Sequence, residues 1–254
     1  MLPIRDENPT ELHPIVTFAF IAANVLIWIL VEQMGQGADF VRSLCEYGAI
    51  PAEITGSVQP GTSVSLGEGA SCVTGGLGRE TLVTSMFMHG SWAHLLGNMW
   101  FLWVFGNNIE DSMGHFRFPI FYILTGLLAS LSHIMADPAS VVPTVGASGA
   151  ISGVMGAYMV LYPKVRVHTL ILLGFYARIV PMPAWSILLL WLVIQVASGL
   201  VSSGVGGGVA FWAHAGGFVA GAVLVKLFQK GTLVQAKRSG HVLSREERSF
   251  FDRW

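Results

Sequence analysis

Long apolar runs with almost no charged residues constrain the fold of this chain more than any other feature. Residues 14–31 form an uncharged run of 18 residues, and comparable runs occupy 83–105, 118–135, 146–163, 184–201 and 209–227, the last with Lys226 near its end. A helix of 18 residues rises about 27 Å, close to the thickness of the bilayer hydrocarbon. Only 11% of the residues are charged, against about 25% in soluble domains. We therefore predict an all-α, polytopic membrane protein, built as a bundle of six transmembrane helices.

The runs divide the chain into a six-helix domain, 1–228, and a charged tail, 229–254. The residues before the first run include three acidic side chains and a single arginine, and the run is longer than the apolar part of a signal peptide. We therefore expect the first helix to be retained. Residues 32–82 form a loop rich in Gly, Ser and Thr, which is too long for a plain connector and is predicted to be structured or functional.

The distribution of Lys and Arg predicts the orientation in the membrane. Six spans place both termini on one side, and twelve basic residues lie on that side: Arg5, Arg117, Lys164, Arg166, Arg178, Lys226, Lys230, Lys237, Arg238, Arg245, Arg248 and Arg253. The other side has Arg42 and Arg79. This bias predicts cytoplasmic termini in a plasma or inner cell membrane, with loop 32–82 outside. Cys45 and Cys72 both lie in that loop, where the environment permits a disulfide. The sequence does not decide between a disulfide and two unpaired thiols.

A serine between two glycines opens the fourth run, at Gly146, Ser148 and Gly149. We expect this serine to lie at the N-terminal end of a helix, where free backbone N–H groups and the helix dipole favour developing negative charge. In the predicted topology, polar side chains from two other runs fall at a similar depth: His94, Asn98 and His214. Small residues alone would serve only helix packing, but polar groups inside a membrane are costly and usually functional. Their convergence from three runs favours a functional site.

Two runs carry narrow faces that would let their helices approach closely. Gly217 and Gly221 form a small-x-x-x-small pattern after His214 on the sixth run. The matching face of the fourth run consists of Ser148, Ser152 and Gly156. Contact between the faces would bring Ser148 within hydrogen-bond reach of His214, as in a nucleophile and its base.

These residues resemble the motifs of a known family, the rhomboid intramembrane serine proteases. Three motifs occur in order: His-x4-His-x3-Asn at His89, His94 and Asn98, Gly-x-Ser-Gly at 146–149, and His-x2-Gly-x3-Gly at His214, Gly217 and Gly221. The resemblance covers residues 80–225 and the six-helix layout. Together the three motifs are highly specific, whereas each alone is only moderately so.

The resemblance implies a serine endopeptidase that cleaves transmembrane segments of membrane proteins near the outer face. A Ser148–His214 dyad would act without a carboxylate, and His94 and Asn98 would bind the oxyanion. The supporting residues would be Gly146, Gly149, Gly217, Gly221 and His89. The implied partners are transmembrane protein substrates and the lipid bilayer, with no nucleic acid, no cofactor and no metal.

The sequence departs from the family pattern at two places. Ser152 stands where many members carry an aromatic residue against which the base histidine stacks, so what orients His214 is open. Residues 78–82 stand where many members carry Trp-Arg, which leaves the anchoring of the loop open.

Three other functions are less favoured. A catalytically inactive rhomboid-like protein that binds membrane clients would not need an intact Ser148 and His214. A transporter with a polar midplane site would be expected to carry buried carboxylates, and none is expected within the runs. A metal site at His89, His94 and His214 lacks a His-Glu-x-x-His motif and a nearby carboxylate.

Access to the site requires the substrate to unwind, because the peptide bonds of an intact helix are shielded. We expect the fifth run, with Trp185 and Trp191, and the glycine-rich link at 204–208 to open as a cap.

Overall fold

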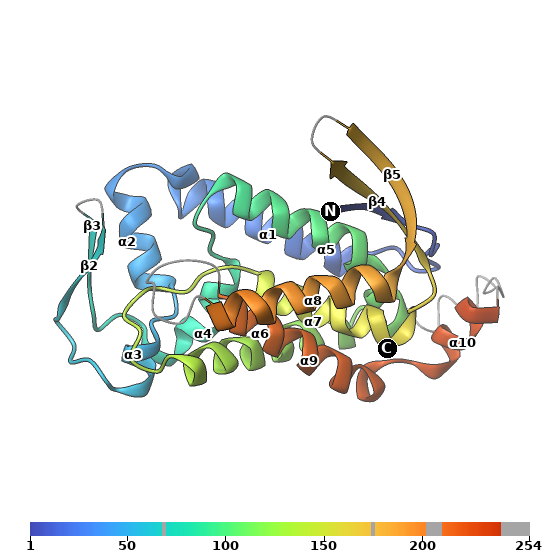
Figure 1. Cartoon of the computed structure of the whole chain (residues 1–254). Coiled ribbons are helices and arrows are strands. Elements are labelled where there is room, and N and C mark those ends of the chain that lie inside the picture. The colour runs from blue at the N-terminus through green and yellow to red at the C-terminus, as the bar shows by residue number, and fades with distance from the viewer. Residues whose placement is uncertain (68–69, 174–175, 202–209, 240–254) are drawn as a thin grey trace.

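A computed structural model of the chain describes residues 1–67, 70–173, 176–201 and 210–239. Its main body is a helical bundle (Figure 1) of α1 (Ile15–Leu30), α5 (Trp92–Met113), α6 (Arg117–Ala136), α7 (Ser148–Leu161), α8 (Ala184–Val201) and α9 (Phe211–Phe228). Helix α7 contacts α5, α6, α8 and α9. Most of its side chains are buried, so the core of the bundle lies around this helix.

Within the described residues, three helices are long and apolar enough to cross a membrane: α6, α8 and α9. Helices α1 and α7 are apolar but have 16 and 14 residues. Helix α5 has 22 residues but carries Glu110 and Asp111. The structure therefore supports a membrane protein with apolar helices, without establishing the expected number of six spans.

The expectation of an all-α fold is corrected by two small antiparallel sheets. Strands β1 (Leu2–Asp6), β4 (Arg166–Leu173) and β5 (Tyr176–Pro183) form one sheet in the order β1-β4-β5. Pro181 and Pro183 disfavour a helix there, and β5 is an edge strand in this sheet, where proline is tolerated. The second sheet pairs β2 (Ser63–Gly67) with β3 (Ala70–Val73).

The segment 32–82 is structured, as its length predicted. It contains η1 (Gln33–Gly35), α2 (Gly37–Tyr47), α3 (Pro51–Thr55), the β2–β3 pair, η2 (Gly78–Glu80) and the start of α4 (Thr81–Thr84), which η3 (Ser85–Phe87) follows. Cys45 on α2 and Cys72 on β3 form a disulfide, which settles the pairing that the sequence left open.

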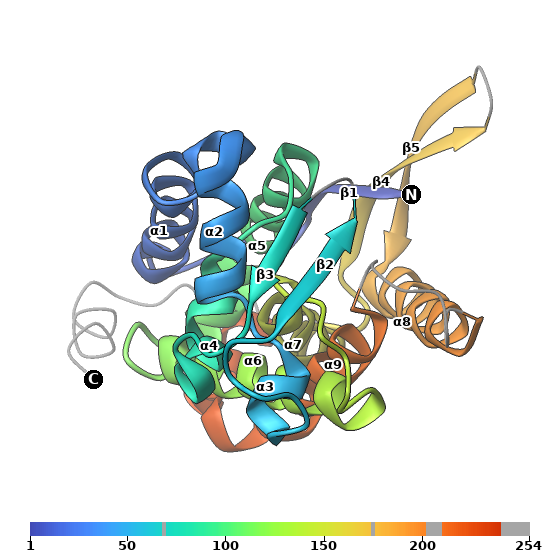
Figure 2. The same ribbon diagram turned by 90° about the vertical axis from the view of Figure 1, so that its left-hand side faces the viewer.

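This segment covers one end of the bundle, which we call the loop end. Figure 1 shows α2, α3, β2 and β3 at the loop end, whereas β1, β4, β5 and α10 (Gly231–Ser239) lie at the opposite end. Figure 2 views the bundle from the loop end and shows α8 at its periphery, on the side away from α1.

Helix α5 differs from the run expected at 83–105 at both of its ends. It begins at Trp92 because the side chain of Ser91 accepts a hydrogen bond from the His94 N–H, at 3.1 Å. It continues through Gly106, where the sequence predicted its end, and stops before Gly114, whose φ is 81°. A Cβ at Gly106 would lie 3.2 Å from Thr17 Cγ2, so this glycine lets α1 and α5 pack closely.

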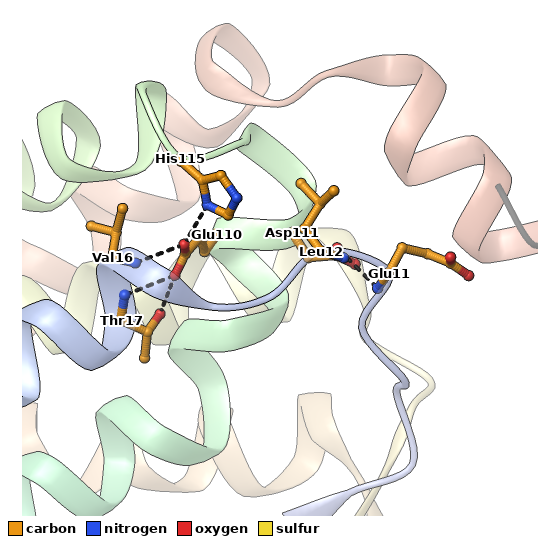
Figure 3. Close-up of polar contacts among 7 residues, drawn as sticks. All are labelled: Glu11, Leu12, Val16, Thr17, Glu110, Asp111 and His115. Carbon is orange, nitrogen blue, oxygen red and sulfur yellow. Dashed lines mark hydrogen bonds and ion pairs between the residues drawn. The ribbon is translucent and has the colours of Figure 1, made fainter. Parts of the chain in front are cut away.

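Two buried carboxylates at the C-terminal end of α5 hold the N-terminal end of α1 (Figure 3). Glu110 accepts hydrogen bonds from the N–H groups of Val16 and Thr17 at 2.9 and 2.8 Å, and from Thr17 Oγ1 at 2.7 Å. Asp111 Oδ1 accepts the Leu12 N–H at 2.7 Å. Because α1 has no side-chain cap of its own, Glu110 satisfies free N–H groups of its first turn. Asp111 holds the segment that leads into the helix. Both carboxylates lie beyond the run expected at 83–105, in the part of α5 that the sequence did not predict as helix.

We expect Glu110→Ala to lower the free energy of unfolding by roughly 3 kcal/mol, because hydrogen bonds to a charged acceptor contribute about 1.5–3 kcal/mol each and are not additive. Chemical denaturation in detergent micelles would measure the loss. Glu80→Ala, at an exposed position, serves as the control. A loss below about 1 kcal/mol would show that Glu110 does not hold α1.

Candidate active site

The backbones of α7 and α9 meet at glycines, which brings the beginnings of the two helices together. A Cβ at Gly217 would overlap the carbonyl oxygen of Gly149, and one at Gly221 would overlap that of Gly153. A Cβ at Gly156 would overlap the carbonyl oxygen of Phe218. The faces predicted to be narrow are thus in contact, but Gly149 and Gly153 make the closest approach in place of the predicted serines.

This contact places Ser148 beside His214. Ser148 is the first residue of α7, and His214 lies in the first turn of α9. His214 Nε2 lies 2.7 Å from Ser148 Oγ, a hydrogen-bond distance. His214 is 9% exposed, whereas Ser148 is half-buried, so Ser148 is the more accessible of the two. This geometry suits a nucleophile and its general base.

The side chain of His94 lies against the backbone of Gly146, next to Ser148. Gly146 has a φ of 131°, a conformation that favours glycine. A Cβ there would be 2.8 Å from His94 Nε2 and 3.4 Å from Ser148 Oγ. The Gly90 N–H points to His94 Nδ1 at 3.4 Å. With Nδ1 as the acceptor, Nε2 is the nitrogen that carries the proton, and it faces the Gly146–Ser148 segment.

Asn98 lies one turn further along α5 from His94, so the two side chains share a helix face. It is 7% exposed, and its Nδ2 has no hydrogen-bond partner among the described residues. A buried amide N–H without a partner is costly. The Nδ2 group is therefore suited to donate a hydrogen bond to an acceptor that is present only during a reaction.

His89 packs behind His94, with their ring centroids 5.2 Å apart. Its backbone N–H donates to Glu32 Oε1 at 2.7 Å, and both residues are fully buried. Glu32 lies in the turn after α1, outside the bundle helices. Burial raises the pKa of the Glu32 carboxyl to about 7, although the hydrogen bond from His89 opposes that shift.

The raised pKa of Glu32 makes stability depend on pH. The folded protein binds more protons than the unfolded chain between pH 4.5 and about 7, so the free energy of unfolding falls as pH rises through that window and levels off above it. The expected fall is roughly 3 kcal/mol. We expect Glu32→Gln to remove this dependence, and thermal unfolding from pH 4 to 8 would measure it. Parallel pH curves for wild type and Glu32→Gln would contradict the assignment, with the exposed Glu80→Gln as control.

Two residues on α8 contact His214 and were not identified as site residues from the sequence. Gln195 Oε1 lies 2.7 Å from His214 Nδ1, and the ring centroid of Trp191 lies 5.8 Å from that of His214. Ser152 donates its hydroxyl hydrogen bond to the carbonyl oxygen of Ser148, at 2.6 Å, within its own helix. The available signal was Gln195 itself, an amide side chain within the otherwise apolar stretch 187–197.

Glu110 and one of the residues expected to admit the substrate lie away from this group of residues. Glu110 follows His94 by 16 positions on α5, about 24 Å along the helix axis, so it does not reach the Ser148–His214 pair. Trp185 is half exposed at the beginning of α8. The link 204–208, expected to act as a cap, lies outside the described residues.

The fold and the site define an apolar helical membrane protein with a serine–histidine pair at a helix junction. Residues 79–230 match the Rhomboid domain. This match covers more than half of the chain, which therefore belongs to the rhomboid family, as the motifs predicted.

Individual relatives support the same family. The chain is 30% identical over 146 residues to Rhomboid protease GluP of Bacillus subtilis, covering 58% of this chain and 24% of the relative. It is 41% identical over 71 residues to Rhomboid-like protein 11, chloroplastic, of Arabidopsis thaliana, covering 28% and 25%. For RHOMBOID-like protein 6, mitochondrial, of the same plant, the identity is 28% over 167 residues, covering 61% and 54%.

The matches therefore span a quarter to about half of each relative's length. Two of these relatives are named for organelles, the chloroplast and the mitochondrion. The comparisons therefore do not support the expected location in a plasma or inner cell membrane.

Proposed function

We propose that this protein is an intramembrane serine endopeptidase that cleaves transmembrane segments of membrane proteins through a Ser148–His214 dyad. The observation that carries the proposal is the 2.7 Å contact between Ser148 Oγ and His214 Nε2 at the junction of α7 and α9. Relatives named as proteases, such as Rhomboid protease GluP, support the same activity.

In the proposed reaction, His214 Nε2 takes the proton of Ser148 as Oγ forms a bond to the carbonyl carbon of the substrate. Collapse of the tetrahedral intermediate breaks the C–N bond, and His214 gives the proton to the leaving amine. Water, activated by the same histidine, then hydrolyses the acyl-enzyme and restores Ser148.

The negative charge of the intermediate needs hydrogen-bond donors at the beginning of α7. The Ser148 N–H is a free donor there, because the first N–H groups of a helix lack internal partners. His94 Nε2, which faces Gly146, and the unpartnered Asn98 Nδ2 would supply two more. Donors that are preorganised in a buried site can stabilise an oxyanion by about 3–4 kcal/mol each.

We further propose that the loop end faces the outer side and that cleavage occurs near that surface. The excess of basic residues among the termini and their loops supports this orientation. The tail 229–254, which begins with α10, would then be cytoplasmic. Substrates with helix-weakening residues near the outer surface would unwind most easily.

Reconstitution of the full chain in liposomes with a single-span substrate tests this function. We expect cleavage within the apolar segment at the end nearest the loop end, mapped by mass spectrometry. The alternative, a catalytically inactive rhomboid-like protein that binds membrane clients, predicts co-purification of the intact substrate without cleavage. Intact substrate after prolonged incubation, with a range of single-span sequences, would favour that alternative.

A further inference from the structure

We propose that Gln195 is a positioning residue that holds His214 in the tautomer needed to accept the Ser148 proton. The inference rests on the proposed protease function and deepens it by adding a third member to the dyad. Gln195 lies on α8, the peripheral helix of Figure 2, and both Gln195 and His214 are 9% exposed.

Three side chains from three helices form a continuous hydrogen-bonded series. Gln195 Oε1 lies 2.7 Å from His214 Nδ1, and His214 Nε2 lies 2.7 Å from Ser148 Oγ. The two contacts occupy both ring nitrogens of His214. The imidazole cannot rotate or flip without losing both contacts, so Gln195 fixes the direction of the ring as well as its protonation pattern.

The chemistry determines which atom of the Gln195 amide faces the ring. A general base needs a free lone pair on Nε2, so the proton of neutral His214 must lie on Nδ1. Oε1 accepts that N–H, and it continues to accept it when His214 becomes an imidazolium. If the amide were turned, its NH2 group would donate to Nδ1, force the proton onto Nε2 and remove the base. Only the arrangement with Oε1 toward His214 serves both stages of the reaction.

Nearby groups do not replace this contact. Ser152 is hydrogen-bonded within α7, and Trp191 packs against His214 through its ring, with an interplanar angle of 38°. Among the residues that the structure describes, the titratable side chains that act electrostatically on His214 are His94 on α5 and His133 on α6. Both are histidines, so neither supplies a carboxylate acceptor for Nδ1. An uncharged amide acceptor orients the ring without adding a buried negative charge, which would be costly in an apolar bundle.

Two substitutions of Gln195 separate positioning from packing. Gln195→Leu keeps a similar volume but removes the acceptor, and we expect kcat to fall about 10²-fold with little change in KM. Gln195→Glu keeps the acceptor and adds a charge, so we expect activity to be largely retained. We also expect the acidic limb of the pH profile of kcat/KM to move upward by about one pH unit, because the carboxylate stabilises the imidazolium. Ser198→Ala, one turn along α8, is the matched control and should leave both quantities unchanged.

The tests use the full chain in detergent and the rate of labelling by a fluorophosphonate probe alongside peptide cleavage. Wild-type labelling that depends on Ser148 supports the proposed function, and an equal labelling rate for Gln195→Leu would then overturn the role of Gln195 alone. An acidic limb that does not move in Gln195→Glu would also overturn it. Absence of Ser148 labelling in the wild type would overturn the proposed function, and the inference with it.

A direct measurement covers the case in which Gln195→Leu does not fold. The ¹⁵N chemical shifts of His214 in the wild-type protein, assigned by comparison with His214→Ala, report the tautomer at neutral pH. We expect the proton on Nδ1. A proton on Nε2 would overturn the proposed role of Gln195, whatever the variants do.

Discussion

Ser148→Ala and His214→Ala are each expected to reduce cleavage of a membrane-anchored substrate by at least about 10⁴-fold, with the protein still folded. The first change removes the atom that forms the acyl-enzyme, and the second removes the base that lies 2.7 Å from it. Because the two side chains act as one unit, the double variant should be little worse than either single variant. Cleavage assays in liposomes, with thermal unfolding as a check on folding, measure the effect.

Each variant has a matched control in the same chain. Ser152→Ala changes another serine of α7, whose hydroxyl bonds to its own helix, and His168→Ala changes a histidine of β4 that pairs with Glu7 at the opposite end. Both controls should retain activity. Substantial cleavage by a folded Ser148→Ala protein would falsify the dyad mechanism.

Asn98→Ala carries the second largest expected effect, a fall in kcat of about 10²–10³-fold. The unpartnered Nδ2 of Asn98 is proposed to donate to the oxyanion only in the transition state, so kcat and kcat/KM should fall together. Asn98→Asp keeps the shape but removes the N–H donor, and it should be equally impaired. If KM alone rises, Asn98 contacts the bound substrate and the oxyanion assignment is wrong.

The helical core could be predicted because its chemistry is local in sequence. The apolar runs correspond to helices of the bundle, and glycines four residues apart indicated where α7 and α9 approach. The glycine–serine motif marked the beginning of α7, and the His214 motif marked the beginning of α9. Short motifs of this kind require only the helical period and the order of the helices to bring their residues together.

The features that the sequence did not predict depend on contacts between distant segments. Gln195 lies 19 positions before His214, and its role follows only from how α8 packs against α9. Glu110 and Asp111 lie beyond the run expected at 83–105. Backbone N–H groups at, and just before, the N-terminal end of α1 donate to their carboxylates. Strands β1 and β4 pair across more than 160 residues, and no local pattern in either segment indicates that partner.

The central claim, that Ser148 is a nucleophile activated by His214, is tested most directly by locating the adduct of a fluorophosphonate probe. The full-length wild-type protein would be labelled in detergent, digested and analysed by mass spectrometry to assign the modified serine. We predict a single phosphonylated residue, Ser148, and no adduct in His214→Ala. An unmodified Ser148, an adduct on another serine such as Ser152, or equal labelling of His214→Ala would contradict the account.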